Sequence, residues 1–282
     1  FHHELARLRS PHFSLVEGHS MFGFKFRLGS VKLFTCFFII NLWMLSISRL
    51  GLALWQEERV SQADNWIHLL LQGMRVDVST LCWLFGIPMV LSLLLGGDNR
   101  LGKIWLWLIR GVLVSGTLLL LFLELSTPAF INTYDLRPNR IFVEYLSYPQ
   151  NIANMLLKGH LAAVVVVFAV LPLAAWALWR LSAYVSRASA YPNVYWRPVL
   201  ALAVLLIAFL GARSSLGHRG LNPALVSFSS DPLVNSLVLN STYSVAFAVK
   251  QLKNEEKTPV SYGQMSDQEL LATLRQASGR PE

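Results

Sequence analysis

The chain has 282 residues, of which 54% are hydrophobic and only 14% are charged, and its mean hydropathy is positive. Soluble domains carry about 25% charged residues, so this composition excludes an ordinary soluble fold and indicates a membrane protein. The net charge is +8, but the basic residues are scattered between apolar runs. Nucleic-acid binding, which needs a basic stripe on a soluble fold, is therefore not expected.

Residues 1–20 are predicted to be a non-native or disordered extension. Met21 begins a short basic segment that leads directly into an apolar run, as a natural start would. The extension contains four histidines, but their spacing matches no compact metal site. The two cysteines, Cys36 and Cys82, lie inside apolar runs and offer no disulfide framework.

A transmembrane domain is predicted over residues 21–212, because five apolar segments in it are long enough to cross a bilayer. These segments are residues 31–55, 66–95, 104–128, 160–180 and 194–212. The first is too long for the core of a signal peptide, so it is expected to remain as an anchor. Pro88 lies inside the second and is a candidate kink, which membrane helices tolerate.

The basic residues predict the orientation of the five segments. They gather before the first segment, between the second and third, and around the loop before the fifth: Lys25, Arg27, Lys32, Arg100, Lys103, Arg180, Arg187 and Arg197. The opposite side has Glu57, Glu58 and Asp64 against Arg59. The positive-inside rule therefore predicts a cytoplasmic N-terminus. Residues 213–282 then form an extracytoplasmic linker.

The linker is predicted to be helical. Asp231 followed by a proline is a good helix start, so a helix is expected from about Pro232, with a candidate break near Asn240. Ser266 and Glu269 have the spacing of a capping box, which predicts a short amphipathic helix to about Ala277.

Three ionisable residues near the ends of the apolar segments are candidates for a site. Arg75 and Asp77 precede the most apolar part of the second segment, and Glu124 ends the third at the same depth. Arg75 and Asp77 are two positions apart on a helix and are not expected to pair with each other. Arg75 either forms a salt bridge with Glu124 or holds a lipid phosphate, for which a guanidinium is well suited.

The polar return between the third and fourth segments is the second candidate. Arg137, Asn139 and Arg140 are followed by aromatic and apolar residues every three or four positions, which predicts a helix lying on the membrane surface. This helix either closes the bundle or forms a wall that contacts lipid headgroups. Glu144, four positions after Arg140, is a candidate salt-bridge partner for it.

Beyond the fifth segment, His218 and Arg219 are close to the membrane. A lone histidine does not predict a metal site, whereas Arg219 could meet a phosphate or another helix. The sequence contains no glycine-rich phosphate loop, no Gly-x-Ser-x-Gly, no His-Glu-x-x-His and no zinc-spaced cysteine pair. The residues alone predict no catalytic group.

Four strings together resemble the N-terminal membrane region of the lipoteichoic-acid-synthase-like phosphoglycerol transferases, within the sulfatase and alkaline phosphatase superfamily. The strings are GMRVDVS at 73–79, RPNRIFVEYLSYP at 137–149, HRGLNP at 218–223 and VNSLVLNSTYS at 234–244. The family's matching positions, for which the resemblance implies structural or headgroup-facing roles, are Arg75, Asp77, Arg137, Asn139, Arg140, Glu144, His218, Arg219 and Asn222.

The resemblance implies a membrane anchor for an extracytoplasmic catalytic α/β domain, in the cytoplasmic membrane of a bacterium. Family members use a threonine nucleophile and a divalent metal, typically manganese, to move a phosphoglycerol or phosphoethanolamine group from a phospholipid. The nucleophile and the metal ligands are expected to follow Glu282, so this part of the chain is expected to hold neither a catalytic residue nor a cofactor.

Two other functions are compatible with the sequence to different degrees. One is a stand-alone, non-enzymatic membrane protein, such as a lipid-binding or accessory subunit whose outer arm docks a partner. A transporter is disfavoured, because the apolar segments carry no central charged pathway and no inverted repeat.

Overall fold

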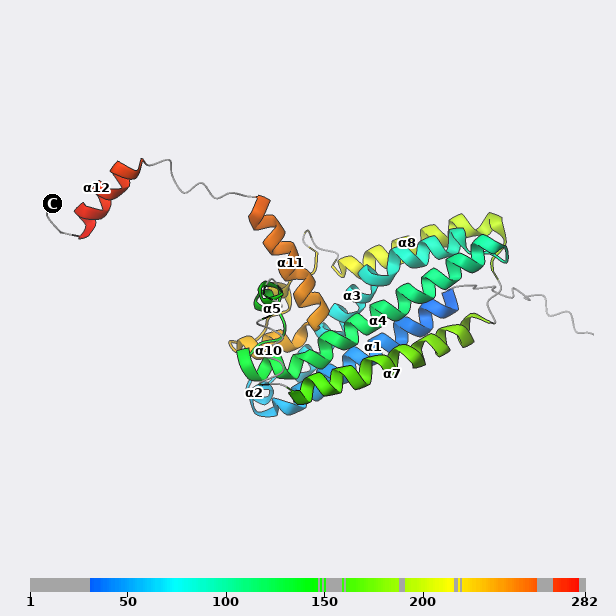
Figure 1. The fold of residues 1–282 in the computed structure, drawn as a ribbon, viewed down its shortest axis with the longest axis horizontal. Coiled ribbons are helices and arrows are strands. Elements are labelled where there is room, and N and C mark those ends of the chain that lie inside the picture. The colour runs from blue at the N-terminus through cyan, green and yellow to red at the C-terminus, as the bar shows by residue number, and fades with distance from the viewer. Residues whose placement is uncertain are drawn as a thin grey trace, which may run out of the picture.

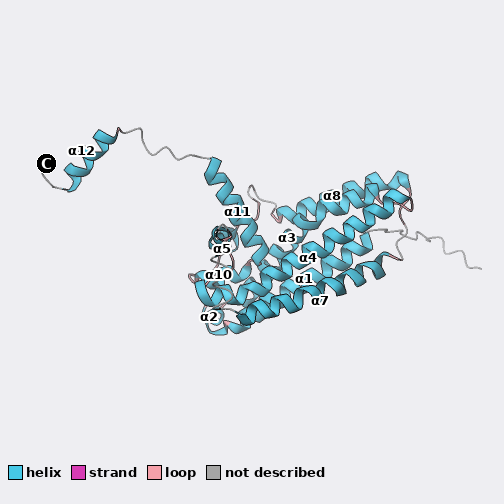
Figure 2. Ribbon diagram, in the orientation of Figure 1, coloured by secondary structure: helices cyan, strands magenta, loops and turns pink. Residues whose placement is uncertain are grey.

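The computed structural model describes residues 31–146, 148, 150, 159, 161–187, 191–215, 218, 220–257 and 266–278. Every regular element among these residues is a helix, and no strand occurs in them (Figure 2). The predicted all-α class is therefore confirmed. The predicted extension, residues 1–20, and the candidate residue Arg219 lie outside the described residues.

Five helices are long and apolar enough to cross a membrane, as predicted. They are α1 (Val31–Trp55), α3 (Trp66–Leu95), α4 (Arg100–Tyr134), α7 (Leu161–Ser186) and α8 (Arg197–Arg213), the last preceded by the 3-10 turn η1 (Val194–Trp196). They lie side by side in one elongated bundle (Figure 1). α3 packs against α8, α4 packs against α7, and α1 lies against both α3 and α4.

One end of the bundle carries all the shorter helices except α12. Here the chain turns from α1 through α2 (Glu57–Gln62) into α3, and α4 ends beside α5 (Arg140–Tyr145) (Figure 1). We call this the α2 end. The opposite end holds the start of α1 and the turns between α3 and α4 and between α7 and α8.

The outward faces of the long helices are apolar. Trp43, Trp83 and Phe168 are among the large hydrophobic side chains left mostly exposed, at 66%, 70% and 75%. Such broad apolar exposure is unfavourable in water but suits a helix surrounded by lipid. The most apolar window of α7 has none of its residues buried inside the described chain.

Two helices run further than the sequence predicted. α4 was expected to end at residue 128 but continues through Pro128 to Tyr134, where Asp135 adopts a left-handed conformation with φ of 55°. A proline removes only one helical hydrogen bond, which the rest of the helix tolerates. Glu124 therefore lies about three turns inside α4 rather than at its end. α7 likewise extends to Ser186 instead of residue 180.

The predicted helix after Asp231 is present as α10 (Pro232–Val238), preceded by the short α9 (Pro223–Val226). The Asp231 side chain accepts from the backbone N–H groups of Leu233 and Val234, which caps α10. The predicted break is also confirmed: α10 and α11 (Ser241–Lys257) meet at a bend of 104°. We call Leu239–Asn240, where they meet, the elbow.

The elbow is inserted into the α2 end of the bundle. The apolar side chains of α10 are fully buried against Leu52, Leu69 and Val76 of the long helices. These residues form a core separate from the second cluster, which fills the rest of the bundle between α1, α3 and α4. Part of the segment that follows the last long helix, predicted as an extracytoplasmic linker, is thus packed into the bundle.

The capping box is confirmed in α12 (Asp267–Ser278). Ser266 N donates to Glu269 Oε2 over 3.1 Å, and Glu269 N donates back to Ser266 Oγ over 3.4 Å. Within the part of the polar return that the structure describes without gaps, up to residue 146, the predicted helix is present as the six residues of α5.

Candidate functional site

The first of two buried ion pairs joins α1 to α3. Arg49 Nη1 and Nη2 donate to the two carboxylate oxygens of Asp77, each over 2.7 Å, and neither side chain is more than 1% exposed. Arg49 Nε donates to the Leu237 carbonyl of α10 over 3.3 Å. This two-pronged geometry is the strongest arrangement of such a pair. It fixes α1, α3 and the end of α10 to one another.

The second ion pair joins α4 to the turn that follows it. Arg137 Nη1 donates to Glu124 Oε1 and Oε2 over 2.9 and 3.2 Å, and both side chains are buried. The Ser48 hydroxyl of α1 also donates to Glu124. Burial lowers the pKa of the Arg137 guanidinium, although the Glu124 carboxylate opposes this shift. Arginine titrates so far above neutrality that the group stays charged.

The elbow and the first residue of α11 donate hydrogen bonds to the carboxylates of both ion pairs. Asn240 Nδ2 donates to Asp77 Oδ1 over 3.0 Å, while Asn240 Oδ1 accepts from Tyr243 N over 2.8 Å. Ser241 N donates to Glu124 Oε1 over 2.9 Å. The first N–H groups of a helix have no partner within it and carry a partial positive charge. Glu124 therefore accepts from the first N–H group of α11, while Asp77 accepts from the Asn240 side chain that caps this helix, and together they hold the elbow in the bundle.

We call this assembly the polar cluster. Its members are the buried or partly buried polar side chains around the elbow: Ser48, Arg49, Asp77, Thr80, Glu124, Thr127, Arg137, Asn240 and Ser241.

Gly73 leaves room for the first ion pair. A Cβ at this position would lie 2.6 Å from Cδ of Arg49 and closer still to its Nε and Cζ. Because Arg49 is held at its other end by Asp77, its side chain cannot move aside without breaking the pair. Only glycine therefore lets α1 and α3 approach with this arginine between them.

We expect Gly73→Ala to destabilise the protein, although alanine favours helix by about 1 kcal/mol over glycine. Separating the buried pair costs about 3–5 kcal/mol, which is larger than the helix gain. Gly111→Ala is the matched control, because nothing lies within 4 Å of a Cβ at that position of α4. Thermal unfolding should show a lower Tm for Gly73→Ala alone, and equal Tm values for the two variants would contradict this role for Gly73.

A more exposed set of ion pairs lies at the α2 end, and we call it the clasp; its members are Arg59, Asp135 and Asp231. Arg59 of α2 donates to Asp135 Oδ1 over 2.5 Å and to Asp231 Oδ2 over 2.6 Å. It thereby links α2, the end of α4 and the start of α10. The hydrogen bond from Arg59 lowers the pKa of Asp231. Exposed pairs of this kind contribute about 0–1 kcal/mol each, so the clasp adds less than the buried pairs.

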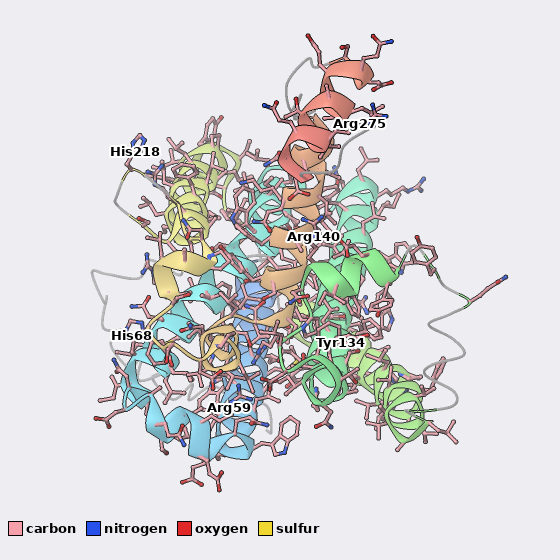
Figure 3. All side chains as sticks on the ribbon, turned by 90° about the vertical axis from the view of Figure 1, so that its left-hand side faces the viewer. Arg59, His68, Tyr134, Arg140, His218 and Arg275 are labelled. Carbon is pink, nitrogen blue, oxygen red and sulfur yellow. The ribbon has the colours of Figure 1, made fainter. Side chains whose placement is uncertain are left out.

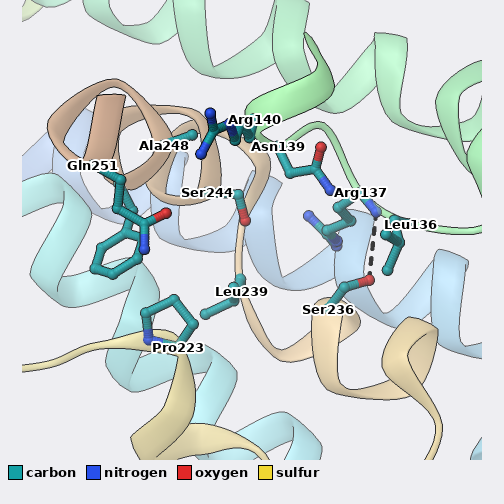
Figure 4. A pocket seen from close by; sticks show the side chains of 11 residues that line it. Leu136, Arg137, Asn139, Arg140, Pro223, Ser236, Leu239, Ser244, Ala248 and Gln251 are labelled. Carbon is teal, nitrogen blue, oxygen red and sulfur yellow. Dashed lines mark hydrogen bonds between the residues drawn. The ribbon is translucent and has the colours of Figure 1, made fainter. Parts of the chain in front are cut away.

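A cavity of about 380 Å³ opens beside the polar cluster. Its wall is formed by the turn 136–140, by α11 and by parts of α9 and α10 (Figure 4). The lining residues are Leu136, Arg137, Asn139, Arg140, Pro223, Ser236, Leu239, Ser244, Phe247, Ala248 and Gln251. The lining contains two arginines and no acidic side chain, so it is suited to an anion.

The predicted pairing of Arg75 is wrong. Arg75 Nε donates to the Ser214 carbonyl over 2.7 Å and Nη1 to Gln72 over 3.0 Å, so it ties α3 to the end of α8. Glu124 pairs with Arg137 instead, because Arg137 turns back into the bundle after α4 ends. Arg75 and Asp77 do not pair with each other, as predicted.

The polar return contains one confirmed pair. Arg140 Nε donates to Glu144 Oε1 over 2.6 Å, and Arg140 Nη1 also reaches Glu255 of α11 over 2.9 Å. Asn139 caps α5 by accepting from Ile141 N. The structure therefore brings Arg137, Asn139 and Arg140 to one cavity.

The remaining candidates lie elsewhere. Asn222 caps α9 by accepting from Leu225 N over 3.1 Å. His218 is exposed at the edge of the molecule, away from Arg140 (Figure 3).

Sequence reasoning missed Arg49, Asn240 and Ser241 as parts of the site. Arg49 had a visible signal, because it is the only charged residue between Val31 and Trp55 once Lys32 at the helix start is set aside. Ionisable groups inside apolar segments are candidates by default. Asn240 and Ser241 had none beyond the predicted break.

Among the described residues, no three His, Cys, Asp or Glu side chains are grouped as a metal site would require. The polar cluster pairs two arginines with two carboxylates, so what it can do chemically is position the helices, while the Arg137 donors that have no partner in the described part of the chain remain available to an acceptor. A comparison with models of known protein families found no match for this sequence, and no solved structure matches its fold.

Proposed function

We propose that the chain is the membrane anchor of a sulfatase-like phosphoglycerol or phosphoethanolamine transferase. The enzyme would take its group from a phospholipid donor at the outer face of the bacterial cytoplasmic membrane. The α2 end would face outward, with the N-terminus in the cytoplasm and α5 at the membrane surface. The threonine nucleophile and the divalent metal, typically manganese, would belong to a catalytic domain that follows.

The observation that carries this proposal is the convergence of three of the four family-like strings on one place. GMRVDVS at 73–79 supplies Gly73 and Asp77, RPNRIFVEYLSYP at 137–149 supplies Arg137, and VNSLVLNSTYS at 234–244 contains the elbow. Strings that are far apart in the chain thus meet in the polar cluster. Such convergence is expected if the shared feature of these proteins is the way in which the outer segment is fixed to the bundle.

The lengths of the helices support the placement of the cluster. α4 has 35 residues, which corresponds to about 52 Å, whereas the hydrocarbon core of a bilayer is about 30 Å thick. About 20 Å of α4 must therefore project from it. If the α2 end projects, the polar cluster lies near the headgroup boundary, where a buried charge costs less than at the bilayer centre.

A transferase of this class would benefit if the chain left the bundle from a fixed position. The acceptor and the donor phosphate meet at a defined height above the hydrocarbon, so the catalytic domain must be held at that height. α11 leaves the bundle from a start that is fixed by two buried carboxylates.

A second candidate, the stand-alone accessory protein, is favoured by α12. Leu270, Leu271 and Leu274 of this helix are 49%, 52% and 57% exposed. An amphipathic helix with an exposed apolar face is typical of a docking arm.

Membrane topology tests the orientation. Single cysteines at Glu58 in α2 and Asn254 in α11 should react with an impermeant thiol reagent in intact cells. A cysteine at Lys103, in the opposite end of the bundle, should react only after permeabilisation. The reverse pattern would remove the proposal. The parent chain, whose own cysteines lie within α1 and α3, is the background control.

The activity is tested with the complete reading frame reconstituted in vesicles that contain phospholipid labelled in its headgroup. A transferase should release diacylglycerol and move the label to an acceptor. A protein that binds the labelled lipid and leaves it intact over many hours would support the accessory function instead.

A further inference from the structure

Arg137 has hydrogen-bonding capacity that the protein does not use. Only its Nη1 reaches Glu124, whereas its Nε and Nη2 are buried and have no partner among the described residues. The side chain is 1% exposed. Buried donors on a charged group are costly to leave unpaired, because they have lost water and gained nothing in return. An acceptor from outside the chain would remove that cost.

The position of this guanidinium is next to the cavity. Figure 4 shows it directed from the turn 136–140 toward the α11 side of the wall. The Ser244 hydroxyl and the Gln251 amide also line the wall, and no hydrogen bond to a described side chain engages either of them. The wall therefore presents several donors toward the same space.

The mouth of the cavity carries a second cation. Arg140 lines it and is 47% exposed, and its partners Glu144 and Glu255 are about as exposed. Exposed ion pairs are worth about 0–1 kcal/mol, so an incoming anion can exchange with one of these carboxylates at little cost. The fully buried Arg137 is the stronger attraction, since charge interactions are less screened there.

The rest of the wall is apolar. Leu136, Pro223, Leu239 and Phe247 contribute apolar side chains to the lining. A free inorganic ion would leave these surfaces unused, whereas an amphiphile would cover them. The volume of about 380 Å³ is near the lower end of the range for small-molecule pockets, so it fits a headgroup and not a whole lipid.

Tyr145 and Leu146, at the end of α5, are 38% and 57% exposed and follow Arg140 closely in the chain. Aromatic and apolar residues in such a position are typical of a protein surface at the boundary between lipid and water.

From these observations we propose that the cavity binds the phosphate of a phospholipid headgroup, with Arg137 as its principal donor and Arg140 at the entrance. The acyl chains would leave past α5 toward the bilayer. The choice of a phospholipid rests on the proposed function. The assignment of an anion site rests only on the two unpaired nitrogens and on the lining.

Binding is tested on the purified full chain in detergent by titration with phosphatidylglycerol, with inorganic phosphate as a soluble competitor. Arg137→Ala would also break the ion pair with Glu124, so it is not the test variant. Ser244→Leu fills the cavity and leaves both buried ion pairs intact. Arg140→Ala removes the entrance charge together with its exposed pairs to Glu144 and Glu255, and it also leaves the buried pairs intact. We expect lipid affinity to fall about tenfold or more in Ser244→Leu and by a smaller factor in Arg140→Ala.

Leu274→Ser, on α12, is the matched control and should bind like the parent chain. Tm values recorded without lipid verify that each variant is folded. Unchanged affinity in Ser244→Leu would overturn the cavity as the site. If inorganic phosphate at low concentration displaced the lipid completely, the lipid assignment would be overturned and the site would be one for a free anion. A complete reading frame that binds phosphatidylglycerol but transfers nothing would support this inference while removing the proposed function.

Discussion

Asp77→Asn is expected to destabilise the protein by about 3–5 kcal/mol, one of the two largest effects expected of a single substitution in the bundle. The asparagine has nearly the same shape, so packing is preserved. Arg49 keeps its charge but loses its only carboxylate, in a position that is 1% exposed. The cost is therefore that of an uncompensated buried cation. A lower Tm or a lower denaturant midpoint in detergent would measure it.

Two further variants test whether the loss of stability comes from the unpaired charge of Arg49 and not from a general loss of polarity. Glu144→Gln removes an exposed charge of the same sign and is expected to change stability by about 1 kcal/mol or less. Arg49→Met combined with Asp77→Leu removes both charges and should recover most of the loss, because apolar side chains of similar volume often replace a buried pair without cost. If Asp77→Asn were no less stable than Glu144→Gln, the pair would not hold α1 to α3.

The long helices could be predicted because their signal is local. α1 and α3 begin and end where the composition changes, and each residue contributes to that change independently of the fold. The end of α4 was predicted incorrectly at Pro128, since proline is a strong breaker in soluble helices but a weak one among packed apolar helices. The packing of α4 against its neighbours, and not the local sequence, therefore determines where this helix ends.

The partners in the polar cluster could not be predicted for the opposite reason. Arg49, Asp77 and Asn240 are distant in sequence, and no local pattern says which carboxylate meets which arginine. Depth along the helices placed Arg75 and Glu124 together, but depth does not specify the face of a helix. Arg75 is turned toward α8 and Ser214, whereas Asp77 is turned toward α1.

The elbow could be predicted from the sequence only in part. A break near Asn240 was predicted, and it is present. Its insertion into the bundle was not predicted, because that depends on acceptors supplied by α3 and α4. The start of a helix needs such acceptors wherever water is excluded.

Glu124→Gln is expected to release the elbow as well as to destabilise the bundle. The glutamine can still accept from Ser241 N, but Arg137 becomes a buried cation without a counter-charge, at a cost of about 3–5 kcal/mol. We expect the turn to move Arg137 toward water and to draw the start of α11 with it. Val238 of α10 is fully buried, so a cysteine placed there should react slowly in the parent chain and faster in the Glu124→Gln background.

Arg137→Met in the same background is the control, because it removes the unpaired charge and should restore slow labelling. Unchanged labelling in Glu124→Gln would show that the elbow is held by its apolar contacts alone.

The double variant Asp77→Asn with Glu124→Gln tests whether the two ion pairs act through one element. Asn240 and Ser241 are adjacent, and each bonds to a different carboxylate. If either substitution alone frees the elbow, the second substitution removes fewer of the interactions that hold it. The combined loss of stability should then be smaller than the sum of the single losses by about 0.5–3 kcal/mol. Strict additivity would mean that each pair stabilises only its own helices, and the elbow would then have no part in coupling α3 to α4.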